Sequence, residues 1–160
     1  MNGPPGALHV AIPFDMATIR QSWGQAIRMW GRVVATHDFV TALARSRECT
    51  RLTVLVPGRS DVGLFRDTIL AGVGTAGCEV QVVAYPDIPS LMAGGPPDVL
   101  HVLDPNLWLA GHIRGQFAVT KPPITGVTHS LANQHFLEWA LLNDANGIDQ
   151  VGLGYVYNLS

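Results

Sequence analysis

Five short apolar runs, rich in Val, Leu and Ile, recur along the chain and constrain its fold more than any other feature. They cover residues 8–14, 51–56, 79–84, 99–103 and 124–128. Most of them do not alternate between apolar and polar residues, which is typical of strands that are buried on both faces of a parallel sheet. Turn-forming pairs such as Pro57-Gly58 and Asp104-Pro105 follow them, so each run has the length of one strand.

Segments with helical spacing of apolar residues lie between these runs. Asp61 is a candidate N-cap for a short helix, and residues 108–117 form a weaker helical pattern. The alternation predicts an α/β fold, namely a Rossmann-like, doubly wound and mainly parallel sheet of five to six strands with helices on both faces. The apolar stripes that predict the helices consist of Val33, Val34, Val40, Leu43 and Ala44, then Leu64, Phe65 and Ile69, and later Phe136, Leu137, Ala140 and Leu141.

The 160 residues fit one domain, residues 1–160, and 48% hydrophobic residues suffice for a core. Two interpretations of residues 151–157 stay open: a sixth strand in a truncated protein, or a short edge strand that closes the domain. A net charge of −2 argues against nucleic-acid binding. With only 14% charged residues, some surface is expected to face another domain, a membrane surface or a second copy in a homodimer. The sequence lacks a signal-peptide pattern and a long apolar span, which predicts a cytoplasmic protein.

The two cysteines, Cys49 and Cys78, have neither metal-binding spacing nor the pattern of a disulfide framework, so both are predicted to be reduced thiols in or near the core. The sequence also lacks a Cys/His cluster, and no metal cofactor is expected. Gly72, Gly74 and Gly77 match the spacing of the dinucleotide-binding fingerprint. They follow an expected helix and precede an expected strand, which is the reverse of the order that the fingerprint requires.

Polar residues follow the predicted strands, where ligands of open α/β sheets bind. Each has an ordinary alternative role as a helix cap or turn residue. His129 is the candidate catalytic residue, because a histidine at a strand end can act as an acid or base or donate to a sugar or phosphate; its alternative role is a hydrogen bond to nearby backbone. The candidate substrate-binding residues are Asp15, Gly31, His37, Arg59, Asn106 and Ser130.

Gly31 and His37 are included because a helix that begins near Gly31 would present its N-terminus to an anionic ligand. His101 lies inside a strand and is predicted to be a hydrogen-bonded core residue, whereas His9 has no informative context. Residues 16–30 contain Trp23 and Trp30 beside two arginines. This segment is interpreted as a sugar or phosphate platform, a membrane-surface helix or a lid packed on the core.

Three motifs together carry a resemblance to a known family: Leu100-His-Val-Leu-Asp-Pro, Ile113-Arg-x-x-Phe and Pro123-Ile-Thr-Gly-Val-Thr-His-Ser-Leu. With Gly31-Arg-Val-Val-Ala-Thr-His-Asp-Phe, they resemble the N-terminal half of retaining glycosyltransferases of the GT-B fold and family 4 type. The resemblance covers roughly residues 8–143. It implies an acceptor-side domain for a sugar or glycan, with a nucleotide sugar as co-substrate and no required metal.

By the same resemblance, His129 lies near the transferred sugar, in the cleft between two domains. The pair of adjacent glycines usual in the family's first loop is absent before Gly31. The C-terminal donor domain is also absent, so the chain alone is expected to be an inactive half of a hexosyltransferase. The alternative is a stand-alone Rossmann-like or flavodoxin-like binding module that dimerises. A nicotinamide-dependent oxidoreductase is a third reading, which rests only on the misplaced glycine pattern.

Overall fold

The structure is a computed structural model that describes residues 8–14, 16, 31–71, 73, 78–93, 95–103, 108–115 and 122–126. These residues form an all-parallel, five-stranded sheet with the order β3-β2-β1-β4-β5. The strands are β1 (Leu8–Pro13), β2 (Cys49–Val56), β3 (Glu79–Ala84), β4 (Val99–Val102) and β5 (Ile124–Gly126). Four of the five predicted runs begin within a residue of the observed strands, and β2 begins two residues earlier than predicted.

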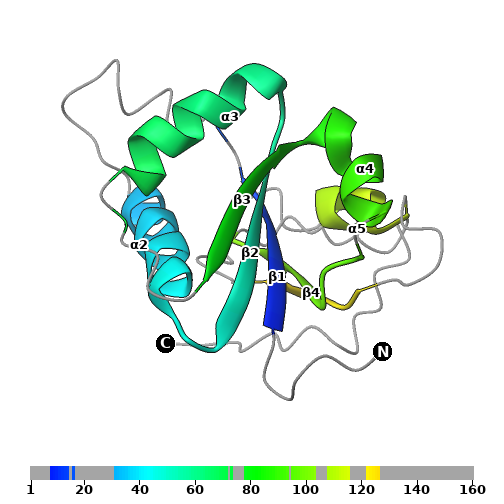
Figure 1. The fold of residues 1–160 in the computed structure, drawn as a ribbon, viewed down its shortest axis with the longest axis horizontal. Helices are drawn as coiled ribbons and strands as arrows, with labels where there is room; N and C mark the ends of the chain where they lie inside the picture. The colour runs from blue at the N-terminus through cyan, green and yellow to red at the C-terminus, as the bar shows by residue number, and fades with distance from the viewer. Residues whose placement is uncertain are drawn as a thin grey trace, which may run out of the picture.

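Helices cover both faces of this sheet. Figure 1 shows α2 (Gly31–Arg45) and α3 (Arg59–Phe65) on one side, and α4 (Ile88–Ala93) and α5 (Trp108–Gly115) on the other. A π-helical segment, η1 (Arg66–Leu70), extends α3, and a 3-10 turn, η2 (Tyr85–Asp87), precedes α4. The predicted Rossmann-like α/β fold is therefore confirmed.

The sheet separates two hydrophobic clusters. Val10 and Ile12 of β1 face the larger cluster, which lies under α2, α3 and η1. Ala11, between them, faces the smaller cluster under α4 and α5. Successive strand residues point to opposite faces, so the same short strand supplies both clusters. β1 is therefore covered on both sides, as the uninterrupted apolar run predicts.

Burial on both faces is uneven along the strands, and β2 shows this most clearly. Residues 52–56 of β2 are all buried, whereas Thr50 is exposed and Arg51 is half-buried. The predicted run begins at Arg51, whereas β2 begins at Cys49 and its continuous buried stretch begins at Leu52. The prediction of strands buried on both faces thus holds for β1 and β2, which supply both clusters, but not for β5.

Two helix predictions need correction. Asp61 is not an N-cap: Gly58 is the N-cap of α3, and Asp61 lies in the first turn. The helix α4 was not predicted, because it is short and contains a proline. The expected helix after Ser130, residues 151–157 and the Trp-containing segment 17–30 lie outside the described residues.

The glycine pattern is flanked as the sequence predicts. It follows η1 and precedes β3, so it does not connect a strand to the start of a helix. Gly72, Gly74 and Gly77 themselves lie outside the described residues. The arrangement around them does not match the dinucleotide fingerprint.

Candidate functional site

The carboxyl-terminal edge of the sheet is the candidate site, because the parallel strands all end there. Pro13, Val102 and Gly126 are the last residues of β1, β4 and β5, and β4 lies between the other two strands. The chain leaves β1 toward α2 on one face, and leaves β4 toward α5 on the other. The β1–β4 boundary is therefore the topological switch point, where open α/β sheets bind ligands.

Phe14 leaves β1 at this edge but points into the core. Its backbone N–H donates to the carbonyl of Leu55 at 2.8 Å, and its ring packs edge-on against Phe65 with centroids 4.8 Å apart. This packing fixes the point at which the chain leaves the sheet. Asp15, the next residue and a predicted binding residue, lies outside the described residues.

A reciprocal pair of hydrogen bonds fixes the turn after β2. The Gly58 N–H donates to Oδ2 of Asp61 at 3.0 Å, and the Asp61 N–H donates to the Gly58 carbonyl at 3.0 Å. Asp61 is 3% exposed. A carboxylate in the first turn of a helix interacts favourably with the helix dipole, so the burial of Asp61 has a structural reason.

Arg59 lies at the same edge and is paired with the residues that follow β3. Its Nη2 is 2.6 Å from Oδ1 of Asp87, and its Nε lies 3.1 Å from Oδ2. The hydrogen bond from Arg59 holds the pKa of Asp87 below its usual value, and the same contact raises the pKa of Arg59. The guanidinium of this predicted binding residue is therefore already paired with a carboxylate, and an anionic ligand would compete with Asp87 for it.

Gly31 and His37 both lie on α2. Gly31 is the first residue of the helix, while His37 lies about 9 Å along the axis at 1.5 Å per residue. Nδ1 of His37 is 3.3 Å from Oδ1 of Asp38, and the His37 side chain is 43% exposed. The helix thus separates the two residues by more than one turn.

His101 has the most unusual environment at this edge. It is the next-to-last residue of β4, and its ring stacks on Phe39 of α2 with centroids 4.8 Å apart. Nδ1 lies 2.8 Å from Oγ1 of Thr125 in β5. Nε2 is buried and has no hydrogen-bond partner among the residues that the structure describes, and burial lowers the pKa of the ring.

The prediction that His101 is a hydrogen-bonded residue inside a strand is therefore confirmed for Nδ1, which contacts Thr125, but not for Nε2. A buried polar atom without a partner is costly, so a polar group of a ligand or of another segment would be stabilised by a hydrogen bond to Nε2. The sequence offered one signal, since His101 interrupts an apolar strand. Asn106, His129 and Ser130, the remaining candidates, lie outside the described residues.

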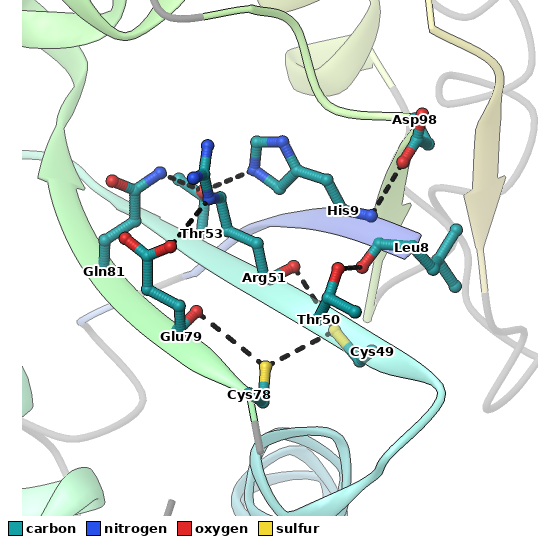
Figure 2. Close-up of polar contacts among 10 residues, drawn as sticks. All are labelled: Leu8, His9, Cys49, Thr50, Arg51, Thr53, Cys78, Glu79, Gln81 and Asp98. Atoms are coloured by element: carbon teal, nitrogen blue, oxygen red, sulfur yellow. Dashed lines mark hydrogen bonds and ion pairs between the residues drawn. The ribbon is translucent and has the colours of Figure 1, made fainter. Parts of the chain in front are cut away.

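A second polar group of side chains crosses three strands in the amino-terminal half of the sheet. Figure 2 shows His9 of β1, Thr53 of β2 and Gln81 of β3 in a row. His9 Nε2 is 2.7 Å from Oγ1 of Thr53, and Gln81 Nε2 donates to the same oxygen at 2.6 Å. Thr53 is fully buried. The row satisfies a buried hydroxyl, and sequence analysis missed it because the strand register was not known.

Charged groups surround this row. Arg51 Nε donates to Oε2 of Glu79 at 3.1 Å, and the backbone N–H of His9 donates to Oδ2 of Asp98 at 2.7 Å. Burial is the main reason why the pKa of His9 is lowered; Arg51 adds to this effect, whereas Asp98 and Glu79 oppose it. The charged groups are already engaged in contacts within the sheet, and the cluster lies away from the carboxyl-terminal edge. Its geometry therefore favours a role in sheet stability over ligand binding.

Within the ranges described above, no group of three or more potential metal ligands occurs. No helix among the described residues is long and apolar enough to span a membrane. Leu8, at 40%, is the one exposed large hydrophobic residue in this part of the chain.

The fold and the strand-end geometry define a Rossmann-like α/β domain with its candidate site at the β1–β4 switch point. No protein-family model, curated protein or solved structure matches the chain.

Proposed function

We propose that the domain is the acceptor-side half of a retaining, nucleotide-sugar-dependent glycosyltransferase of the GT-B type. The observation that supports this most is the adjacency of β1, β4 and β5. The motifs on which the resemblance rests include β4 and β5 and continue directly beyond them. Their polar residues therefore leave the sheet from neighbouring strands, at the edge where such folds bind ligands.

In this proposal His129, three residues beyond the end of β5, contacts the reacting sugar. Asp15 lies two residues after β1, and Asn106 and Ser130 follow β4 and β5; in this proposal all three bind the acceptor or the donor phosphates. The reaction replaces the bond from the anomeric carbon to the nucleoside diphosphate with a bond to an acceptor hydroxyl. Because a second domain would hold the donor, this chain contributes only part of the stabilisation of the transition state.

His101 supports the proposal from the described part of the edge. Its buried Nε2 has no partner, and its position near the end of β4 is one strand from β1 and one from β5. A hydroxyl group of a sugar, or a side chain that a sugar orders, would satisfy this nitrogen. His101 is thus a positioning residue for the same site.

The test measures, by surface plasmon resonance, whether the 160-residue chain binds immobilised oligosaccharides, UDP-glucose or GDP-mannose. We expect binding of a subset of the glycans, and a loss of about tenfold or more for His129→Ala, which removes one charge-assisted hydrogen bond. The matched control, His112→Ala, changes an exposed histidine of α5 and should bind like the unaltered chain.

Tight binding of a flavin or nicotinamide dinucleotide with no glycan binding would instead favour the stand-alone binding module. A dimer in sedimentation whose formation abolishes glycan binding would favour the same alternative. Efficient hexosyl transfer by the 160-residue chain alone would contradict the need for a second domain.

A further inference from the structure

Two buried thiols meet at the amino-terminal ends of β2 and β3. Cys49 is the first residue of β2, and Cys78 directly precedes β3. Their Sγ atoms are 3.6 Å apart, and both cysteines are free. Cys49 is 1% exposed and Cys78 is 4% exposed. The thiols are thus buried, as the sequence predicts, but their contact is not evident from the sequence.

The strand register brings the two residues together. Arg51 pairs with Glu79 in the parallel ladder, so Cys78 lies beside Thr50 and one residue diagonally from Cys49. A strand spacing of about 4.8 Å and a rise of about 3.3 Å place the two Cα atoms roughly 5.8 Å apart. This value lies within the range of about 4.4 to 6.8 Å that disulfides require. The observed contact between Sγ atoms must shorten to about 2.0 Å, which side-chain rotation can achieve.

Figure 2 shows that the two sulfur atoms point toward each other from neighbouring strands. Cys49 Sγ is also 3.3 Å from the Arg51 carbonyl, and Cys78 Sγ is 3.8 Å from the Glu79 carbonyl. Each thiol is therefore held by its own strand. A bond between them would need no rearrangement of the β2–β3 ladder.

We propose that Cys49 and Cys78 are a modification site, at which exchange with a small-molecule disulfide such as oxidised glutathione forms an intramolecular disulfide. The Cys49 thiolate attacks the small disulfide and releases one small thiol, which leaves a mixed disulfide on Cys49. The Cys78 thiolate then displaces the second small thiol and forms the Cys49–Cys78 bond. Two protein thiols are oxidised, one small disulfide is reduced, and the two protons pass to the released thiols.

The environment makes this reaction slow in the folded protein. Burial, together with the contact with Cys49, raises the pKa of the Cys78 thiol to about 12, so little thiolate forms near neutral pH. The rate should therefore rise steeply above neutral pH. Once formed, such a disulfide would hold β3 to the sheet for a long time rather than respond rapidly to changes in redox conditions.

The disulfide would close a loop of the chain that contains two of the elements over the larger hydrophobic cluster. The two cysteines are 29 positions apart in the sequence, and α3 and η1 lie between them. A link of this length restricts the unfolded chain. The midpoint of thermal unfolding, Tm, should rise by about 5 to 10 °C when the bond forms.

The test uses the full 160-residue chain, reduced and then incubated for a day with excess oxidised glutathione at pH 8. We expect the intact mass to fall by about 2 Da, the loss of two hydrogen atoms. Peptide mapping should join the peptides of Cys49 and Cys78, and dithiothreitol should reverse the rise in Tm. The matched controls, Cys49→Ser and Cys78→Ser, should show neither the mass loss nor the Tm increase.

The same oxidation in urea, followed by refolding, is the second measurement. The refolded disulfide form should have the raised Tm as well. The proposal is overturned if the folded chain keeps its mass after a day of oxidation. It is equally overturned if the disulfide, formed by either route, lowers Tm.

Discussion

Removal of the Asp61 carboxylate should destabilise the protein, because this carboxylate holds the turn at the start of α3. Asp61 accepts a hydrogen bond from the Gly58 N–H at 3.0 Å and is 3% exposed. In Asp61→Ala, the loss of a cap-type hydrogen bond costs about 1 kcal/mol. The loss of a negative charge near the helix N-terminus costs about 0.5 to 1 kcal/mol more. The expected decrease in the free energy of unfolding is therefore about 2 kcal/mol.

Two further variants separate these contributions. Asp61→Asn keeps an acceptor oxygen and nearly the same volume but removes the charge, so it should cost only about 0.5 to 1 kcal/mol. Asp67→Ala removes an exposed carboxylate from η1 and should change stability by less than about 0.5 kcal/mol. Urea unfolding followed by circular dichroism measures all three, and Asp61→Ala should lower Tm by about 4 to 8 °C.

The comparison among the variants is decisive. If Asp61→Ala and Asp67→Ala lose equal stability, the buried hydrogen bond is not an important contact. If Asp61→Asn costs as much as Asp61→Ala, the charge rather than the geometry of the acceptor holds the turn. Only a graded loss, with Ala worse than Asn and Asn worse than the exposed control, agrees with the structure.

Thr53→Val should lower the free energy of unfolding by about 1 to 3 kcal/mol, because it leaves the polar neighbours of a fully buried hydroxyl without their partner. The control Thr50→Val, at an exposed position of the same strand, should lower it much less. Equal losses of the two variants in urea denaturation would contradict this account. Stability should also fall as the pH drops below about 6.5. The folded state lowers the pKa of both His9 and His101, so the unfolded chain binds more protons between the folded value and 6.5. Unfolding measured from pH 7.5 to 5.5 should therefore show a smaller slope in a variant with both His9→Gln and His101→Gln, whereas an unchanged slope would place the titrating groups elsewhere.

The fold was predictable because each strand has a local signal in the sequence, namely a short apolar run. β1 and β2 supply residues to the clusters on both faces of the sheet, and such burial requires the apolar runs that the sequence contains. The helix α4 was missed because six residues with a proline carry little periodic signal. The start of α3 was misplaced by three residues, because an aspartate stabilises a helix start both as the N-cap and within the first turn.

The candidate site was predictable only in its location. The rule that ligands bind at strand ends points to the correct edge without any knowledge of side-chain partners. The pairing of Arg59 with Asp87 joins residues 28 positions apart, and the row formed by His9 and Thr53 depends on register across strands. Neither has a local sequence signal, since both arise when distant segments become neighbours.

The position of β1 at the centre of the sheet also has a consequence for the order in which the chain assembles. β1 is synthesised first, and its partner β2 follows about forty residues later, whereas its other partner, β4, emerges only after residue 98. During synthesis the β1–β2–β3 layer with α2 and α3 can form while the opposite side of β1 is still open. Until then, Ala11 lacks its packing against Leu100 and the other residues of the smaller cluster. Protection of backbone amides from hydrogen exchange should therefore appear in β2 and β3 before it appears in β4.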